Sequence, residues 1–233
     1  MITSDKDKAE ALNSYFSQCF NLAFPPLSLS DNITGCTEQC PPELLCEKDE
    51  VLELLLSIDV SKSSGPDGIS GRMLKATAHS IVLSVTTLFN KSIASGTVPS
   101  GWKTSAVVPI PKGSDNTNVS NYRPISLLSI LSKLLELHMH GLIYKHLLLY
   151  HPIAIQQWGF QPYKSTVSAL VDVTHQWSRH LDNGAEVCVV FFDLKKAFDS
   201  VPHRTLINKL SDIGLPQHLI HGLRTILLTD PST

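Results

Sequence analysis

The order of the expected elements along this 233-residue chain predicts an α+β fold. Helical patterns come first, and strand-like segments appear later among further helices, without the regular alternation of a parallel α/β protein. The chain is 42% apolar and 17% charged, a balance typical of a globular protein. At this length it can bury a sizeable core, as one large domain or as two small ones.

Helices are predicted where apolar residues recur three and four positions apart. Pro25 and Pro26 would end the first helix, Ser165 can cap the fifth, and Gly214 with Pro216 would separate the last two. The predicted helices span residues 5–23, 48–58, 71–94, 129–150, 166–182, 203–211 and 217–228.

Three segments are predicted to be extended. Residues 105–110 form a short strand, and residues 121–126 are extended because Pro124 disfavours helix at Arg123. Residues 187–192, Val-Cys-Val-Val-Phe-Phe, are β-formers and predict a buried strand. A loop over residues 26–46 and turns over residues 61–68 and 156–160 connect these elements.

No sorting signal is visible in the sequence. The start has no basic patch followed by an apolar stretch, and no segment approaches the roughly 20 apolar residues of a membrane span. These observations predict a nuclear or cytoplasmic protein without a membrane partner. The five cysteines are expected to be free thiols. No structural zinc is expected, because the spacings of Cys36, Cys40 and Cys46 fit no standard zinc knuckle.

The net charge of −2 is distributed unevenly. Up to Ser57 there are three basic and ten acidic residues, a net −7, whereas the rest has sixteen basic and eleven acidic residues, a net +5. An acidic N-terminal part followed by a basic remainder is compatible with phosphate contacts in the later part of the chain. Ordinary solvated charge gives the same pattern, so composition leaves both interpretations open.

An acid ends the apolar run of residues 187–192. Asp193 is either a hard oxygen ligand for Mg²⁺, which binds protein through one or two carboxylates plus substrate phosphates, or a cap for the following turn. Phe198 is either a core aromatic or a wall of a substrate pocket. Asp199 is either a second ligand or a hydrogen-bonding residue of that turn.

Two basic residues flank the polar loop that follows the first predicted strand. Lys112 and Arg123 together would clamp a triphosphate, since Arg offers a planar fork and Lys a point charge. The alternative is that both are solvated surface residues. The extended segment around Pro124 favours the first interpretation, because a fixed backbone aims the guanidinium of Arg123.

Five motifs follow one another in a recognisable order. They are Ser64-Gly-Pro-Asp-Gly68, Trp102 with Val107-Val-Pro-Ile-Pro-Lys-Gly113, Asn121-Tyr-Arg-Pro-Ile-Ser-Leu-Leu128, Gln157-Trp-Gly-Phe160 with Ser165-Thr166, and Phe191-Phe-Asp-Leu-Lys-Lys-Ala-Phe-Asp199. This set resembles the reverse transcriptases of non-LTR (LINE-type) retrotransposons, relatives of group II intron enzymes. The resemblance covers roughly residues 60–228, and the helix over residues 8–20 looks like the segment that these proteins carry between endonuclease and polymerase.

The resemblance implies a right-hand polymerase, of which this chain would hold the fingers and the beginning of the palm. Residues 1–57 would form a helical N-terminal extension, and residues 58–233 a partial reverse transcriptase domain. The implied activity is RNA-directed DNA synthesis by two-metal nucleotidyl transfer. The implied partners are an RNA template, a DNA primer and a deoxynucleoside triphosphate, and the implied cofactor is Mg²⁺, two ions in the complete enzyme, with Mn²⁺ as a possible substitute.

The same resemblance assigns roles to individual residues. Asp193 looks like the first catalytic, metal-binding aspartate, and the Leu194 carbonyl like an additional ligand. Arg123 and Lys112 would hold the triphosphate, and Phe198 would stack under the incoming sugar and reject a 2′-hydroxyl. The segment that supports the template and the nascent base pair would include Gln157, Gly159 and Phe160.

The sequence departs from the family pattern at two points. Gln161 stands where the family usually has an arginine, which weakens a phosphate contact there. The Asp-Asp hairpin that carries the second metal ligand in the family is not found after residue 228. Asp199 is only a possible secondary ligand, so little or no polymerase activity is expected from this chain.

Two other functions remain open from the sequence. The chain is alternatively a non-catalytic RNA-binding or protein-interaction remnant, which the basic balance after Ser57 and the histidine-rich helix of residues 131–150 favour. An unrelated α/β phosphotransferase built on Asp193 is the third possibility, and it leaves the four upstream motifs unexplained.

Overall fold

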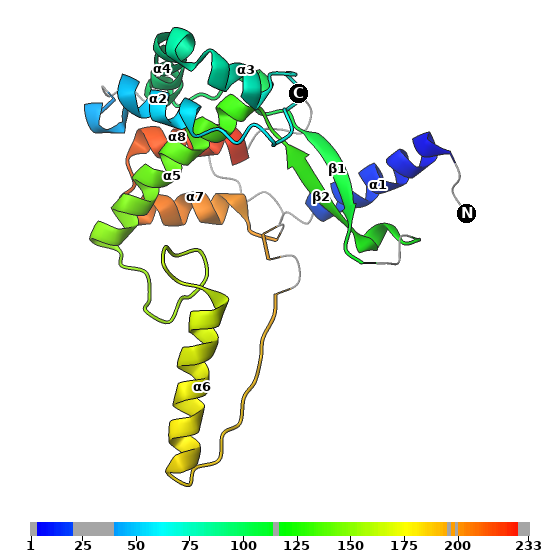
Figure 1. The fold of residues 1–233 in the computed structure, drawn as a ribbon, viewed down its shortest axis with the longest axis vertical. Helices are drawn as coiled ribbons and strands as arrows, with labels where there is room; N and C mark the ends of the chain where they lie inside the picture. Colours follow the sequence, from blue (N-terminus) through cyan, green and yellow to red (C-terminus); the bar gives the residue numbers. More distant parts are fainter. Residues whose placement is uncertain (1–3, 21–39, 114–116, 195–196, 199, 228–233) are drawn as a thin grey trace. The chain divides into compact units, whose positions relative to one another are not determined.

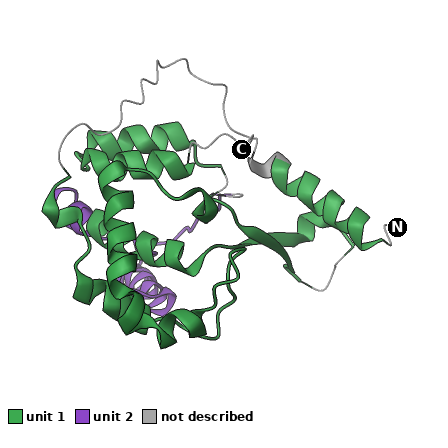
Figure 2. Ribbon diagram, turned by 90° about the horizontal axis from the view of Figure 1, so that it is seen from above, with its two compact units in different colours: residues 1–144, 198–233 green, residues 145–197 purple. Residues whose placement is uncertain are grey.

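The structure, a computed structural model, describes residues 4–20, 40–113, 117–194, 197–198 and 200–227. It divides into two compact units: unit 1 comprises Met1–Tyr144 and Phe198–Thr233, and unit 2 comprises Lys145–Ala197 (Figure 2). The division predicted at residue 57 stays a prediction. Residues on both sides of that position, among them Leu55 and Leu74, belong to one apolar core.

Unit 1 contains most of the helices and a two-stranded sheet (Figure 1). Helix α5, Ile130–Tyr150, begins in unit 1 and ends in unit 2. The other elements of unit 1 are α1 Asp5–Phe20, η1 Pro42–Leu44, α2 Lys48–Leu56, α3 Gly71–Ala76, α4 Ala78–Ser95, η2 Ser100–Trp102, β1 Ala106–Pro111, η3 Val119–Asn121, β2 Tyr122–Leu127, α7 His203–Asp212 and α8 Gln217–Leu227.

The core of unit 1 lies among α2, α4, α5, α7 and α8. Phe89 of α4 is fully buried and meets the ring of Trp102 edge to face, with ring centroids 6.0 Å apart. Asn90 on the same helix accepts a hydrogen bond from the Cys46 amide at 2.8 Å and donates one to the Cys46 carbonyl at 3.1 Å. Burial and the neighbouring Glu50 raise the pKa of Cys46 to about 12, so its thiol stays protonated at neutral pH.

The single helix predicted over residues 71–94 is wrong, because two helices occupy this stretch. Ser70 caps α3 by accepting a hydrogen bond from the Met73 amide. Thr77 interrupts the helical path with φ −101° and ψ 6°, and its hydroxyl donates to the Met73 carbonyl at 2.8 Å. Side-chain hydrogen bonds of this kind compete with the regular helix ladder, and apolar periodicity does not reveal them.

The two extended segments predicted near residue 110 form an antiparallel ribbon. Strand β1 pairs with β2 so that Ala106 faces Leu127 and Ile110 faces Arg123. The Lys112 amide continues the pairing with a 2.7 Å hydrogen bond to the Asn121 carbonyl. Helix α1 contacts η3 at the end of this ribbon, and Phe16 of α1 is buried.

Unit 2 is built on α6, Thr166–Asp182, with the end of α5 and two irregular segments. Helix α6 has the predicted bounds. The Ser165 hydroxyl accepts from the Ser168 amide at 3.1 Å, and the Ser168 hydroxyl accepts from the Ser165 amide at 2.9 Å, which completes a capping box.

The buried strand predicted over residues 187–192 is wrong. These residues have no ladder partner among the described residues, whose only sheet is the β1–β2 ribbon. Phe191 is 85% exposed and Phe192 is 92% exposed. A strand needs hydrogen bonds to a neighbour as well as β-forming side chains, and here the side chains alone are present.

The described architecture is therefore mixed helix with a small sheet, which agrees with the predicted α+β class. Among the described residues, no helix combines the length and the apolar content needed to cross a membrane.

A polar contact joins α5 to the start of α2. His138 is buried, with Nδ1 2.7 Å from Oε1 of Glu50 and Nε2 3.1 Å from the Leu44 carbonyl. We expect Glu50→Ala to lower the free energy of unfolding by about 1 kcal/mol, because a buried ring nitrogen loses its partner while solvent still reaches position 50.

Urea unfolding followed by circular dichroism measures this change. Asp49→Ala is the matched control, because Asp49 has the same charge in the same helical turn, is exposed and does not contact His138. Equal destabilisation by both substitutions would show that the helix dipole, not the contact with His138, is responsible.

Candidate functional site

The sequence-predicted site residues fall into both units. Unit 1 holds Lys112, Arg123 and Phe198, and unit 2 holds Gln157, Gly159, Phe160, Asp193 and Leu194. Asp199 lies outside the described residues.

The β1–β2 ribbon brings Lys112 and Arg123 into one small element. Arg123 is exposed and stands opposite Ile110, and its guanidinium makes no hydrogen bond or ion pair within the described part of the chain. Lys112 is also exposed, but its ammonium donates to the Ser120 carbonyl at 2.9 Å. Arg123 therefore offers an uncommitted guanidinium, whereas the charge of Lys112 is partly used to close the ribbon.

The Ser64–Gly68 motif forms a turn that supports this ribbon. The Gly68 amide donates to the Gly65 carbonyl at 3.1 Å, with Pro66 and Asp67 between them, an order typical of a type I turn. A Cβ placed on Gly65 would lie 2.5 Å from the Ser129 nitrogen and 2.6 Å from the Leu128 carbonyl carbon. The turn thus packs directly against the backbone where β2 passes into α5.

The Gln157–Phe160 turn of unit 2 is closed by its own side chains. Gln157 donates to the Gly159 carbonyl at 3.3 Å, and Gln161 donates to the Gln157 carbonyl at 2.9 Å. Gln161, the residue that departs from the family pattern, is therefore engaged within the turn. Phe160 is 86% exposed and has a positive φ of 59°.

Sequence analysis missed a lysine that organises the same turn. The Lys164 ammonium donates to the carbonyls of Ile155 at 2.8 Å and Gln157 at 2.9 Å, and lies 5.1 Å from the ring centroid of Trp158. The lysine is only seven residues from Gln157, but a lone lysine in a polar stretch has no sequence signal that separates this role from solvation.

Asp193 lies in the exposed segment before the end of unit 2. Its carboxylate makes no hydrogen bond or ion pair with the described residues, and the next residue, Leu194, is 78% exposed. No group of three or more metal-ligating side chains occurs in the described part of the chain. One free carboxylate beside a backbone carbonyl fits part of a Mg²⁺ ligand set, whose other ligands come from water and substrate phosphates.

Phe198, the predicted sugar gate, is 76% exposed in unit 1. Aromatic rings are normally buried in a folded core, so the alternative of a core aromatic is not what the structure shows for this residue.

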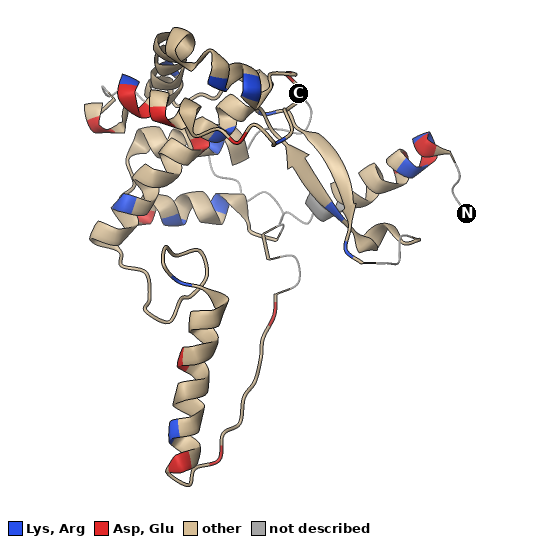
Figure 3. Cartoon of the chain, viewed as in Figure 1, with Lys and Arg blue, Asp and Glu red and all other residues tan. Residues whose placement is uncertain are grey.

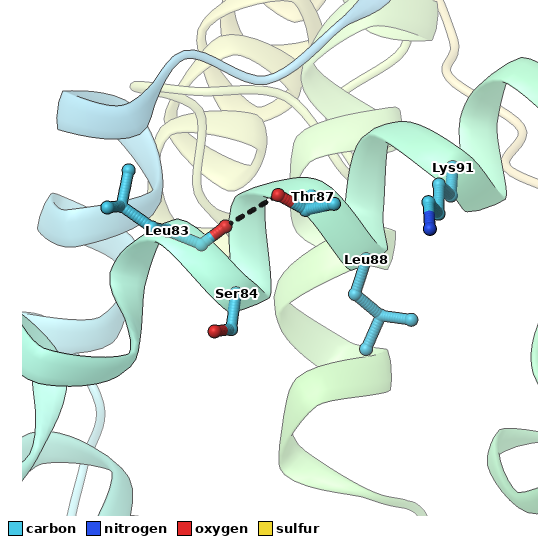
Figure 4. Close-up of a pocket in the computed structure, with 5 residues that line it drawn as sticks. All are labelled: Leu83, Ser84, Thr87, Leu88 and Lys91. Atoms are coloured by element: carbon cyan, nitrogen blue, oxygen red, sulfur yellow. Dashed lines mark hydrogen bonds between the residues drawn. The ribbon is translucent and has the colours of Figure 1, made fainter.

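Neither the charge distribution nor the surface shape of the described residues indicates a second functional site. Acidic residues gather at the start of α2, whereas the ribbon carries Lys112 and Arg123 (Figure 3). A shallow surface depression of about 420 Å³ lies on the outer side of α4 (Figure 4). Its lining, Leu83, Ser84, Thr87, Leu88 and Lys91, contains none of the predicted site residues.

The cysteines whose side chains the structure describes form no metal-binding group with other ligating residues. Cys40 is half-buried, Cys46 is buried with a raised pKa, and Cys188 is exposed in unit 2. Cys36 lies outside the described residues. The expectation of no structural zinc stays a prediction.

Comparison with known families defines the class of protein. Residues 110–229, more than half of the chain, match the family described as reverse transcriptase (RNA-dependent DNA polymerase). The chain belongs to this family. The matched region contains β2 with Arg123, the turn with Phe160, and Asp193.

Three of the similar proteins come from mobile elements of Drosophila melanogaster. The chain is 31% identical to the probable RNA-directed DNA polymerase from transposon BS over 71% of its length. It is 31% identical over 90% of its length to the putative 115 kDa protein in type-1 retrotransposable element R1DM, and 29% identical over 72% to the RNA-directed DNA polymerase from mobile element jockey. The resemblance to non-LTR retrotransposon reverse transcriptases is confirmed.

The chain spans only a small share of these relatives. It covers 18% of the transposon BS protein, 21% of the R1DM protein and 19% of the jockey polymerase.

The support of the ribbon by Gly65 can be tested by one substitution. We expect Gly65→Ala to lower the free energy of unfolding by about 1–3 kcal/mol, because the added methyl meets backbone atoms that have no room to move. Urea unfolding measures the loss. Gly101→Ala, where a Cβ meets nothing within 4 Å, is the control and should be close to neutral. Equal stability of the two variants would contradict the close packing.

Proposed function

We propose that this chain is a segment of an RNA-directed DNA polymerase of a non-LTR retrotransposon. The observation that carries the proposal is the family match over residues 110–229, which contains Arg123 and Asp193, both exposed and uncommitted in the described structure. An exposed arginine and an exposed carboxylate without partners are what triphosphate and metal binding need before substrate arrives.

In this proposal the fold is part of a right-hand polymerase. Residues 60–182 would contribute mainly fingers, and the segment from Val187 onward would begin the palm. The β1–β2 ribbon supports this assignment, because it presents the guanidinium of Arg123 on a twisted, solvent-exposed element held at its base by Gly65.

Arg123 is the residue to which we assign the incoming triphosphate. Its planar guanidinium binds two phosphate oxygens at once, and no side chain of the described residues competes for it. Lys112 is assigned a weaker part, since its ammonium already donates to Ser120. Phe198 would stack under the sugar, and its exposed ring supports that role.

Asp193 and the Leu194 carbonyl are the residues that would hold a divalent cation, Mg²⁺ or Mn²⁺. Such an ion supplies Lewis-acid stabilisation of the transferring phosphoryl group and the leaving pyrophosphate. Asp193 contributes negative charge with both oxygens uncommitted, and the Leu194 carbonyl adds a neutral oxygen next to it. Asp199 stays a possible secondary ligand by sequence alone.

Template support is assigned to Gln157, Gly159 and Phe160. The side chains of Gln157 and Gln161 hold the turn in shape, and the exposed Phe160 ring is positioned to contact a base. The partners proposed for the complete protein are an RNA template, a DNA primer and deoxynucleoside triphosphates.

Triphosphate binding gives a direct test with the chain itself. We expect Arg123→Ala to weaken binding of a deoxynucleoside triphosphate about tenfold in titration calorimetry, because charge-assisted hydrogen bonds to phosphate are lost. Arg72→Ala removes an exposed arginine of the same unit and should change little. Equal losses in both variants would indicate general charge attraction and contradict the assignment.

Primer extension tests whether this chain has polymerase activity, which would exclude the alternative of a non-catalytic RNA-binding remnant. We expect no processive extension of a DNA primer on an RNA template by this chain with Mg²⁺, because Asp193 is the one carboxylate assigned to a two-metal reaction. Extension that disappears in Asp193→Ala would contradict the expected inactivity and exclude the remnant. RNA binding that weakens with salt, without extension, is the outcome expected of the remnant as well.

A further inference from the structure

Two aromatic residues of unit 2 have backbone conformations that side chains normally avoid. Phe160 has φ 59° and Tyr163 has φ 61°, the only positive φ values of non-glycine residues in the described part of the chain. A Cβ makes this left-handed conformation costly, and for a bulky residue it marks a turn under strain. Strain of this kind persists only where the surroundings hold it, and it gathers at functional sites.

Hydrogen bonds from Lys164 stabilise this part of the backbone. Its ammonium donates to the Ile155 and Gln157 carbonyls at 2.8 and 2.9 Å and sits over the Trp158 ring. The Lys164 amide also donates to the Gln161 carbonyl at 3.4 Å, which closes a four-residue turn. The capping box at Ser165 then fixes the first turn of α6 directly behind it.

Tyr163 occupies the position in this turn where glycine is favoured. In the turn Gln161-Pro162-Tyr163-Lys164, proline at the second place and positive φ at the third are marks of a type II turn, whose third residue is usually glycine. Tyr163 is 107% exposed, so its ring contributes nothing to the packing of unit 2. The backbone is therefore strained at Tyr163, although the exposed ring does not stabilise the fold by packing.

The surroundings of the two rings suit a polyanion. No acidic residue occurs between Glu136 and Asp172 in the sequence, and Lys164 forms no ion pair with a carboxylate among the described residues. Exposed aromatic rings bind single-stranded nucleic acids by base stacking, largely independently of sequence.

We propose that Tyr163, displayed by the Lys164-held turn, stacks on a base of a single-stranded nucleic acid beside the base contacted by Phe160. This inference rests on the proposed function, because it adds a second stacking residue to the template-support turn. Lys164 is a positioning residue, since its ammonium is committed to two carbonyls and acts through the shape of the turn.

Tyr163→Gly tests the ring without disturbing the backbone. Glycine adopts positive φ freely, so this substitution removes the ring and relieves the strain together. We expect roughly tenfold weaker binding of labelled oligo(dT) or oligo(U) in fluorescence anisotropy, within the range found when a stacking aromatic is removed. Tyr163→Phe keeps the ring and should bind as tightly as the original chain.

The salt dependence distinguishes stacking from phosphate contacts. Tyr163→Gly and Lys164→Met should both weaken binding while leaving the slope of log affinity against log salt unchanged, because neither residue neutralises a phosphate. A lower slope for Lys164→Met would overturn its positioning role. Tighter binding of oligo(U) than of oligo(dT) would assign the bound strand to RNA, and the reverse to DNA.

The outcomes for the inference and for the proposed function differ. Unchanged binding in Tyr163→Gly, with triphosphate binding still lost in Arg123→Ala, overturns the inference alone. Failure of the original chain to bind either oligomer overturns both the inference and the nucleic-acid part of the proposed function. Loss of binding in Tyr163→Gly without a lower unfolding midpoint supports the inference.

Discussion

The contact between Gly65 and the backbone of Leu128 and Ser129 is the constraint on which the arrangement of unit 1 depends. It joins the loop after α2 to the junction of β2 and α5, so the ribbon and the helical core share one fixed point. Ser129 is 1% exposed, and its hydroxyl has no hydrogen-bond partner among the described residues. Only a residue without a Cβ permits this approach. The direction in which the ribbon presents Arg123 is therefore set by a glycine almost sixty residues earlier in the chain.

Unit 2 uses a different means to position its aromatic residues. It has little apolar burial of its own, and none of the described residues of α6 is buried. The turn before α6 is instead held by hydrogen bonds from Lys164 and two glutamines to backbone carbonyls. Polar contacts at an exposed site stabilise weakly in water. Several of them acting on one short turn, next to a capped helix, still restrict it enough to keep two aromatic residues at positive φ.

Local signals in the sequence predicted most helix bounds well, whereas the assigned site residues stay predictions. The bounds of α6 were predicted correctly from the N-cap Ser165 and from the spacing of the apolar residues that follow it. Both signals depend only on residues that are close in the sequence. The helix break at Thr77 was missed, since it depends on a single hydrogen bond from the Thr77 hydroxyl to the Met73 carbonyl. The prediction of a strand over Val187–Phe192 was wrong because a strand also needs a hydrogen-bonded neighbour, which the local sequence does not reveal. The positive φ of Tyr163 was missed because glycine is the residue that usually indicates such a conformation. The role of Lys164 was missed because a lysine in a polar stretch looks like a solvated residue.

The unpaired segment that ends at Asp193 has a consequence for its chemistry. Asp193 was interpreted as an acid at the end of a buried strand, where the sheet would fix its carboxylate before any metal binds. The described segment has no ladder partner, and its side chains from Val190 to Leu194 are well exposed. A cation that binds such a carboxylate must also order the backbone that carries it, and this cost subtracts from the affinity. In the proposed metal-binding role of Asp193, the unpaired backbone would therefore make cation binding weak. Pairing of the Val187–Phe192 backbone, more than a change of side chain at position 193, is what would turn this acid into a strong ligand.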